Sequence, residues 1–445
     1  MKSTFLWGFC AASIFLAGAA QANDPWTKIT VPLKQYSVKV GNDVKKIKPR
    51  CALGDPYSFH FKPGKRDKLL VYYNGGGACW NSNTCVGSLL QPSQPPTYFP
   101  SAAIQNDPAK MGGILAVNNN NPYADWSMLF ISYCTGDVHV GSTVTNYEYP
   151  LGSGNMVPIY HRGFDNSLYT LNWVKGKINP DKILVAGSSA GSYGATLNLP
   201  WLKAILKSPK LKAYDPHAYK TFAVSDGGMG VITDVHEFVH AVFGEHPVEE
   251  SSVWNIYDTL HPTYTSFPSL PDAVIDQPEN FMPVTYKKLI ARYPNDRVAQ
   301  YTTAYDAIQI FFWDIMLNPD TPLLWGAGLT DPLFIGQWNR EMNKITGDKI
   351  TGGLRASLPK NYRSYVDLGC NHTIFRYDNF YTSFLTSSTG QAITFLQWLT
   401  AMTGEKNADK NNWQNLSCTP GVDCGEENLT PEGIQACLAR TFFAP

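Results

Sequence analysis

Short apolar runs recur through the middle of the chain, and most of them end in a glycine, a polar residue or a turn. Runs of this length, rich in β-branched and aromatic residues, predict buried strands. Alternation of apolar and polar residues over Tyr36–Val40 predicts a half-exposed strand near the N-terminus. We expect the buried strands at Leu69–Tyr73, Ser127–Cys134, Lys182–Ala186, Tyr219–Ser225, Arg297–Tyr305 and Tyr365–Gly369.

Apolar residues at helical spacing lie between these strands. They predict helices over Ser167–Val174 and Ala195–Leu206, and an apolar helix that begins at Ile308. Strands that alternate with helices predict an α/β-hydrolase-like architecture, in which helices flank a mostly parallel central sheet. We expect one catalytic domain over residues 23–445, with a lid-like insertion at about 230–296 and a cysteine-containing tail at about 405–445.

The first 22 residues have the pattern of a signal peptide. Lys2 provides the basic start, Phe5–Ala20 is almost wholly apolar, and Ala20-Gln21-Ala22 is a cleavage site of the A-x-A type. The apolar run is too short to favour a permanent membrane anchor. We therefore expect cleavage after Ala22 and a secreted or periplasmic protein.

Cysteine usage agrees with export. Removal of the signal peptide takes Cys10 and leaves eight of the nine cysteines, an even number that is typical of disulfides in exported proteins. The closest spacings predict a bridge between Cys79 and Cys85, and a second bridge between two of Cys418, Cys424 and Cys437.

The balance of charge limits the classes of binding partner that the sequence predicts. The chain has 36 basic and 36 acidic residues, so no net field attracts nucleic acid or anionic lipid. Aromatic residues make up 13% of the chain, which suits a surface that stacks on sugars or encloses acyl chains. The sequence leaves the oligomeric state open.

The most informative motif is Gly187-Ser188-Ser189-Ala190-Gly191, which follows a predicted strand without a polar spacer. A serine in a G-x-S-x-G turn between strand and helix sits in a strained backbone conformation, and small flanking residues permit it. Ser189 is therefore the candidate nucleophile.

A glycine triplet follows the strand Leu69–Tyr73. Without side chains, backbone N–H groups can converge on one oxygen, as an oxyanion hole requires. We expect donors from Gly76, Gly77 or Ala78, and another from Ala190, the residue after the nucleophile.

The acid and the base are chosen by position. Asp306 and His372 each follow a late strand, and Ser189, Asp306 and His372 appear in the chain order of α/β-hydrolases. Nine histidines compete for the role of base. The alternative acids are Asp226, Asp314, Asp331 and Asp367.

A rival chemistry comes from His236-Glu237-Phe238-Val239-His240, an H-E-x-x-H sequence. On a helix the two imidazoles share one face and could bind Zn²⁺, with Glu237 as general base. His246 falls at the spacing of a third ligand, but the glycine of the longer metalloprotease signature stands at position 244 instead of 243.

Six motifs together resemble the pectin acetylesterase family, which also includes the animal Notum carboxylesterases. In chain order they are YYNGGGACWNSNTC, YCTGD, HRGF, GSSAGSYG, AYDAIQ and CNHT. The resemblance runs from about Leu69 to Thr373. Plant members usually have Trp directly after the glycine triplet, where this chain has Ala78.

The resemblance implies a serine esterase with no metal or organic cofactor. Ser189, Asp306 and His372 fall on the family's triad, and Gly77, Ala78 and Ala190 fall on its oxyanion hole. The implied substrate is an acetyl ester on a polysaccharide such as pectin, with a longer acyl ester on lipid or protein as the alternative. A catalytically inactive binding protein of the same fold is a further alternative, as is a zinc hydrolase that uses His236 and His240.

Overall fold

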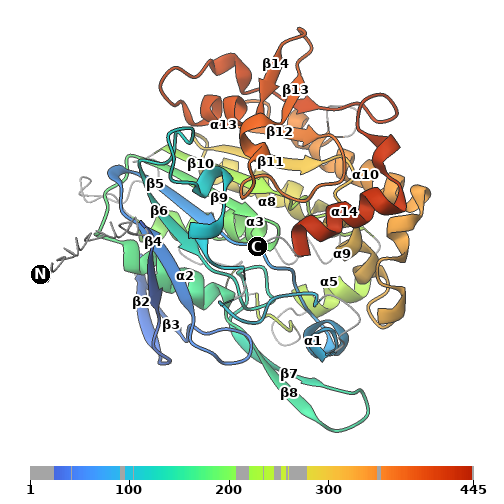
Figure 1. Ribbon diagram of the computed structural model, residues 1–445. Coiled ribbons are helices and arrows are strands. Elements are labelled where there is room, and N and C mark those ends of the chain that lie inside the picture. The colour runs from blue at the N-terminus through green and yellow to red at the C-terminus, as the bar shows by residue number, and fades with distance from the viewer. Residues whose placement is uncertain are drawn as a thin grey trace, which may run out of the picture.

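A nine-stranded sheet forms the centre of the computed structural model (Figure 1). The structure describes residues 25–41, 43–90, 96–103, 105–206, 220–233, 235–244, 252–256, 259, 278–347 and 352–442, so the expected signal peptide lies outside the described residues. The strands lie in the order β1 (Thr27–Thr30), β4 (Ser58–Lys62), β6 (Trp126–Ile131), β5 (Lys65–Tyr73), β9 (Lys182–Ser188), β10 (Lys220–Asp226), β11 (Arg297–Thr303), β12 (Tyr362–Asp367) and β15 (Leu416–Ser417).

Seven strands of this sheet, from β6 to β15, run parallel. Only the pairs β1–β4 and β4–β6 are antiparallel. All six residues of β6 are buried, as are the last six of the seven in β9 and β10. Continuous burial is typical of parallel strands covered on both faces, and it explains why these strands read as unbroken apolar runs. The expected α/β-hydrolase-like class is confirmed.

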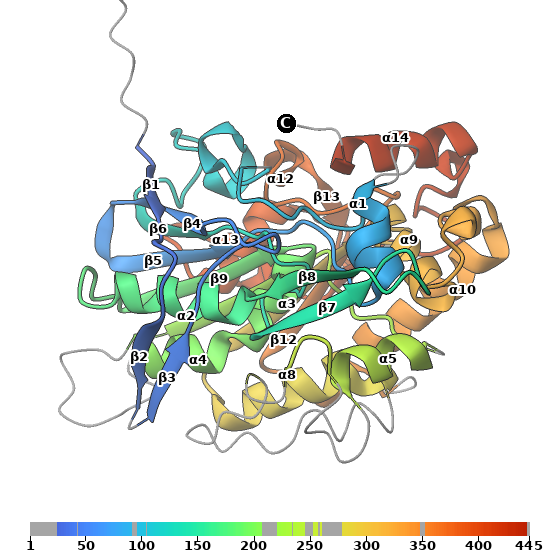
Figure 2. The same ribbon diagram turned by 90° about the horizontal axis from the view of Figure 1, so that it is seen from below.

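Helices cover both faces of the sheet. In Figure 2, α4, α5 and α8 lie on one side of the molecule and α12 and α14 on the opposite side, with strands between them. The helices are α1 (Ser88–Leu90), α2 (Gly163–Val174), α3 (Ala190–Leu197), α4 (Leu199–Ile205), α5 (His236–Phe243), α8 (Phe281–Arg292), α9 (Ala307–Leu317), α10 (Pro332–Thr346), α11 (Leu354–Ser357), α12 (Asn379–Thr382), α13 (Phe395–Thr403) and α14 (Pro431–Phe442).

The helix predicted over Ala195–Leu206 differs from the structure in two ways. It begins earlier, at Ala190, directly after the turn that carries Ser189. It is also interrupted at Asn198, where α3 ends and α4 begins. Pro200 has no N–H to donate and is tolerated only in a first helical turn, so a single continuous helix is excluded.

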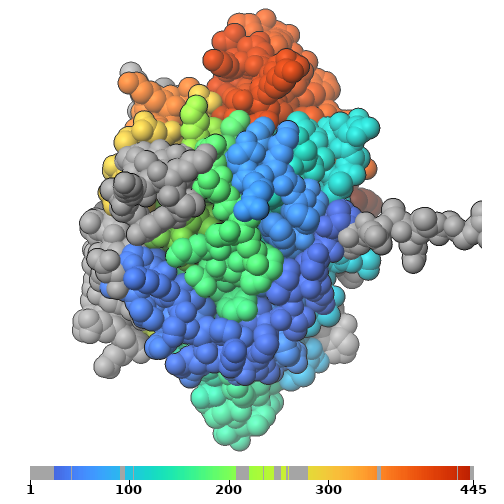
Figure 3. All heavy atoms as spheres, turned by 90° about the vertical axis from the view of Figure 1, so that its left-hand side faces the viewer, coloured from blue at the N-terminus to red at the C-terminus, as the bar shows by residue number. Residues whose placement is uncertain are grey.

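In the described part of the chain, three hairpins lie outside the central sheet. They are β2 (Tyr36–Val40) with β3 (Asp43–Ile47), β7 (Thr143–Glu148) with β8 (Met156–His161), and β13 (Phe384–Thr386) with β14 (Ala392–Thr394). The β7–β8 hairpin projects from the body of the molecule (Figure 3). The sequence predicted only β2 among these strands.

The region predicted as a lid, at about 230–296, is described only in part. It contains α5 and α8, and α8 buries Met282, Tyr286 and Leu289. This helix is therefore a packed part of the domain. The boundaries of the lid stay a prediction.

Eight cysteines form four disulfides: Cys51–Cys134, Cys79–Cys85, Cys370–Cys437 and Cys418–Cys424. The two predicted bridges, Cys79–Cys85 and one within the C-terminal group, are confirmed. Among the described residues, none of the helices is long and apolar enough to cross a membrane.

Candidate active site

The strand order brings five segments, including all the candidate catalytic residues, to one edge of the sheet. Parallel strands β5, β9, β10, β11 and β12 are consecutive neighbours. Their carboxyl ends are followed by the glycine triplet, Ser189, Gly227, Asp306 and His372 respectively. Because ligands bind at the carboxyl ends of such strands, these segments are placed where a site is expected.

Ser189 lies in a strained turn between β9 and α3. Its φ and ψ are 58° and −128°, in a region that residues with side chains rarely adopt. A Cβ on Gly187 would lie 2.0 Å from the carbonyl oxygen of Gly191, and a Cβ on Gly191 would lie 2.0 Å from that of Tyr73. Both glycines of the motif are therefore required by close backbone packing. Ser189 N–H donates to the carbonyl of Asp226, 2.7 Å away, which ties the turn to β10.

His372 and Asp306 form a buried pair. The Nδ1 atom of His372 lies 2.9 Å from each carboxylate oxygen of Asp306, and the two side chains are 1% and 0% exposed. Asp306 is the N-cap of α9 and accepts the N–H groups of Ile308 and Gln309. This orientation leaves Nε2 of His372 free, and it has no hydrogen-bond partner among the described residues, Ser189 included.

The alternative acids have other partners. Asp226 accepts the Ser188 hydroxyl at 2.5 Å and the N–H groups of Ile374 and Phe375 at 3.0 and 3.1 Å. Burial raises the pKa of Asp226 to about 6. Asp226 thus joins the nucleophile turn to the loop that carries His372.

The remaining three acids also have structural contacts. Asp314 accepts the N–H groups of Gly326 and Gly328. Asp331 caps α10 through the N–H of Leu333, and Asp367 accepts the hydroxyl of Tyr301. No hydrogen bond joins any of these carboxylates to His372 in the described part of the chain.

The glycine triplet lies directly beside Ser189. A Cβ on Gly75 would lie 2.7 Å from Cβ of Ser189. Gly76 and Gly77 have φ values of 153° and 77°, which favour glycine. Gly77 pairs with Tyr98 in an isolated antiparallel bridge, formed by Phe99 N–H with Gly76 O at 3.1 Å and Ala78 N–H with Thr97 O at 3.0 Å.

This bridge corrects one predicted donor. The N–H of Ala78 already donates to Thr97 O, so it cannot also reach an oxyanion without breaking the bridge. The Gly76 carbonyl points towards Tyr98 and Phe99, because it accepts the N–H of Phe99. In a planar trans peptide the N–H of the next residue points the opposite way, so the N–H of Gly77 points away from the bridge. In the described part of the chain, the N–H groups of Gly76, Gly77 and Ala190 make no hydrogen bond.

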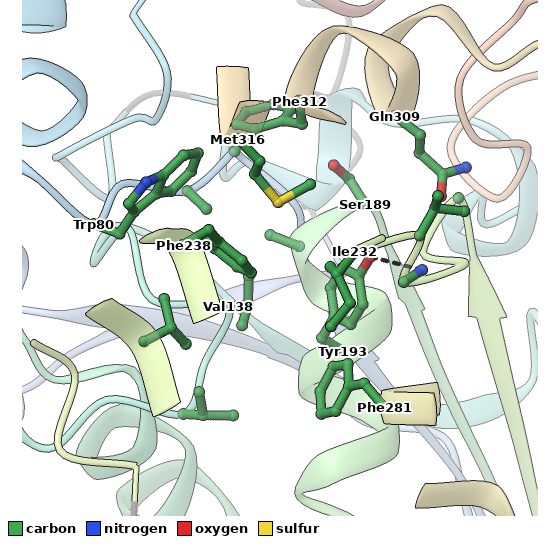
Figure 4. A pocket seen from close by; sticks show the side chains of 18 of the residues that line it. Trp80, Val138, Ser189, Tyr193, Ile232, Phe238, Phe281, Gln309, Phe312 and Met316 are labelled. Atoms are coloured by element: carbon green, nitrogen blue, oxygen red, sulfur yellow. Dashed lines mark hydrogen bonds between the residues drawn. The ribbon is translucent and has the colours of Figure 1, made fainter. Parts of the chain in front are cut away.

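A large apolar cavity opens at these residues (Figure 4). Ser189, Gly77, Ala190 and His372 all belong to its wall, and the space that protein atoms leave unfilled is about 920 Å³ when its open mouth is included. The rest of the wall is mostly aromatic and aliphatic, with contributions from α3, α5, α8 and α9. Figure 4 places Trp80 and Phe238 across the cavity from Ser189.

The H-E-x-x-H sequence lies on α5, as a metal site would require. The rings of His236 and His240 are 6.5 Å apart, and both side chains are exposed. Among the described residues, no third ligand lies close to both, and His246 lies outside those residues. The only described group with metal-ligand spacing is Cys79, Cys85 and His161, whose two cysteines form a disulfide.

Two side chains of the site were not predicted. Gln309 donates through Nε2 to Asp306 at 2.8 Å and accepts the N–H of Met229 at 2.8 Å. Tyr133 donates its hydroxyl to Gly77 O and accepts Val138 N–H, both at 2.9 Å. Gln309 stands three residues after Asp306 in the AYDAIQ motif, which is the one signal that could have found it.

Comparisons with known proteins show which families this chain resembles. The family model described as pectinacetylesterase matches residues 34–239, a range that holds the glycine triplet and Ser189 but not Asp306 or His372. A curated relative, palmitoleoyl-protein carboxylesterase Notum from Schmidtea mediterranea, is 27% identical over 216 residues, or 46% of this chain. The chain spans only 38% of the length of that relative.

A solved structure supports the fold. The Wnt deacylase Notum from Drosophila matches 86% of this chain and 95% of its own, with a TM-score of 0.50 and 16% identity. At this identity the match concerns the fold alone. The family model and the curated relative confirm the resemblance, and the solved structure confirms the α/β-hydrolase-like fold: the chain is similar to the pectinacetylesterases and the Notum carboxylesterases.

Proposed function

We propose that the protein is an exported serine carboxylesterase. Nε2 of His372 takes the proton from Ser189 Oγ, which attacks the ester carbonyl carbon, while Asp306 holds the imidazole in one tautomer and stabilises the imidazolium. The alcohol leaves with that proton. Water, deprotonated by the same histidine, then attacks the acyl-enzyme and releases the carboxylic acid.

The oxyanion donors follow from the free N–H groups. Gly77 and Ala190 donate to the oxygen that becomes negative, with Gly76 as a third donor, and the N-terminus of α3 adds its positive dipole end. The N–H of Ala78 instead holds the loop of the glycine triplet in place through its hydrogen bond to the carbonyl of Thr97. No step requires a metal or an organic cofactor.

One observation carries this proposal. His372, which the buried carboxylate of Asp306 holds in one orientation, lies in the wall of the same cavity as Ser189 in its strained strand–helix turn. Structural ion pairs are also buried, but they do not leave the second imidazole nitrogen without a partner beside a cavity.

The cavity favours an acyl group longer than acetyl. Most of the residues in the wall are aromatic or aliphatic, and an acetyl group would leave much of this apolar surface in contact with water. The resemblance implied an acetylated polysaccharide, but burial of each further methylene stabilises binding by about 0.8 kcal/mol. We therefore favour the alternative, a longer acyl ester, in line with the palmitoleoyl group in the name of the curated relative.

Two measurements test the proposal. A fluorophosphonate probe should label Ser189, and peptide mapping should find no label on the adjacent Ser188 or on Ser192. Along a series of p-nitrophenyl acetate, butyrate and octanoate, kcat/KM should rise by about fourfold per methylene until the cavity is filled. If p-nitrophenyl acetate is hydrolysed fastest, the protein is instead an acetylesterase. Loss of activity to a chelator, together with full activity in Ser189→Ala, would instead establish the zinc hydrolase.

A further inference from the structure

Gln309 donates a side-chain hydrogen bond to the same carboxylate that binds His372. Its Nε2 lies 2.8 Å from Oδ2 of Asp306, while Nδ1 of His372 lies 2.9 Å from each oxygen. The backbone N–H groups of Ile308 and Gln309 both bind the other oxygen, Oδ1. Without the Gln309 amide, His372 would therefore be the one described partner of Oδ2.

The rest of the Gln309 amide is also held. Nε2 donates to Oγ1 of Thr302 at 3.0 Å, and Oε1 accepts the N–H of Met229 at 2.8 Å. The hydroxyl of Thr302 itself donates to the carbonyl of Thr303. A flipped amide would set an oxygen against Asp306 and an NH₂ group against the Met229 N–H. The amide therefore has one favourable orientation, with its donor end towards the carboxylate.

The contact with Met229 reaches a loop that packs on the histidine. Met229 follows Gly227, where a Cβ would lie 2.8 Å from Cε1 of His372. The φ of Gly227 is 69°, so this close approach also depends on a conformation that favours glycine. One amide thus connects the carboxylate of Asp306 with the loop against the imidazole ring.

We propose that Gln309 is a positioning residue of the catalytic pair, which fixes the rotation of the Asp306 carboxylate and moderates its attraction for a protonated His372. This inference rests on the proposed esterase function and concerns the same site, since Gln309 and Ser189 line one cavity (Figure 4). A hydrogen bond donated to a carboxylate stabilises its charge, so the carboxylate attracts the imidazolium less strongly. Gln309 therefore keeps the imidazole able to accept the serine proton to a lower pH.

Two substitutions at one position test this role. Gln309→Met keeps the length of the side chain and removes both amide groups. On p-nitrophenyl butyrate, kcat should fall by about tenfold to hundredfold, the effect of one hydrogen bond to a charged group, and KM should not rise. The pH at which kcat/KM reaches half its maximum should rise by about half a unit to one unit.

Gln309→Glu separates the two halves of the amide. It keeps an acceptor for the Met229 N–H but sets an oxygen against Asp306. Its pH midpoint should rise at least as far as that of Gln309→Met, because a second carboxylate adds negative charge near His372. If Gln309→Glu instead keeps the kcat and the pH midpoint of the intact enzyme, the contact with Met229 is sufficient and the proposal is wrong.

Gln300→Met is the matched control. Gln300 accepts the Tyr362 hydroxyl at 2.7 Å and donates to the carbonyl of Gly228 at 3.4 Å, in the same loop as Met229. No hydrogen bond within the described residues joins Gln300 to the catalytic pair. Gln300→Met should lower the melting temperature and leave the pH midpoint unchanged. An equal shift of the midpoint in Gln300→Met and Gln309→Met would overturn the proposal.

Two other ionisable side chains act on the pair through their charges, Asp226 on His372 and Tyr193 on Asp306. Burial raises the pKa of Asp226 to about 6, so this carboxylate titrates in the same range of pH. Both side chains are the same in every variant. The difference between variants therefore reports on Gln309.

A direct titration separates this inference from the proposed function. In Ser189→Ala, nitrogen-15 NMR of labelled histidine should follow His372, whose signal is identified by its loss in His372→Gln. Adding Gln309→Met should raise the midpoint of this signal. If no ester is hydrolysed and no probe labels Ser189, the esterase assignment fails, whereas the titration still measures the effect of Gln309. If esters are hydrolysed but neither midpoint moves, only the role of Gln309 is wrong.

Discussion

The imidazole Nδ1 of His372 lies 2.9 Å from each carboxylate oxygen of Asp306, although 66 residues separate the two in the chain. This contact predicts that Asp306→Asn lowers kcat by about 10³- to 10⁴-fold, because an amide no longer holds the imidazole in the tautomer that accepts the serine proton. Steady-state kinetics and circular dichroism on the same preparation would check it.

Asp226→Asn is the control for that variant. An asparagine keeps only one acceptor oxygen for the three donors that Asp226 binds, so we expect a loss of about 1–3 kcal/mol in the free energy of unfolding. The folded fraction should keep kcat within tenfold of the original. If Asp306→Asn keeps its rate and Asp226→Asn loses it, the acid is misassigned.

Tyr133→Phe should lower kcat by about tenfold without raising KM. The hydroxyl of Tyr133 links Gly77 O to Val138 N–H, so its loss lets the oxyanion loop reorient, at a smaller cost than the 10²- to 10³-fold of a direct donor. Tyr98→Phe removes a hydroxyl that donates to Cys85 O at 3.1 Å and does not touch Gly77 O. Tyr98→Phe should therefore lower the stability of the protein and leave kcat unchanged. An equal fall of kcat in Tyr133→Phe and Tyr98→Phe would contradict the role of Tyr133.

His161 predicts a pH effect on stability. Its Nδ1–H donates to Thr135 O and its Nε2 accepts the Tyr147 hydroxyl, and burial lowers its pKa from 6.5 to about 4. Between these values the unfolded chain binds a proton that the folded protein does not. Stability contributed by His161 is therefore full above pH 6.5 and is lost as the pH falls towards 4.

The measurement compares the intact protein with His161→Gln. Over the range from pH 6.5 to pH 4, the difference in unfolding free energy between the two should shrink by about 3 kcal/mol. Denaturant titrations at several pH values would measure it, and the other titrating groups are common to both proteins. A difference that stays constant with pH would show that His161 is not held neutral by the fold.

The disulfides predict unequal losses of stability. Cys370–Cys437 closes a separation of 67 residues and ties the segment before His372 to α14, whereas Cys418–Cys424 closes a separation of 6. The entropy of loop closure gives about 4 and about 2 kcal/mol for the two. Denaturation of the paired Cys→Ala variants should show this order, and the reverse order would exclude a dominant entropic effect.

Local chemistry made Ser189 predictable. A strand, a G-x-S-x-G pentapeptide and a helix follow one another in the chain, and the steric demand for Gly187 and Gly191 comes from backbone atoms at that same turn. The buried parallel strands were predictable for a similar reason, since burial on both faces produces unbroken apolar runs. Short edge strands and hairpins such as β7–β8 carry no such run, and they were missed.

The sequence by itself thus determined the parallel sheet, the strained serine and the order of candidate acids and histidines. Only the tertiary structure decided which aspartate reaches His372, because that contact depends on β11 and β12 being neighbours in the sheet. It also removed Ala78 as a donor through a bridge to Thr97, and it gathered Trp80, Phe238 and Phe312 from distant segments into one cavity wall. Such choices rest on contacts between residues far apart in the chain, which no local pattern encodes.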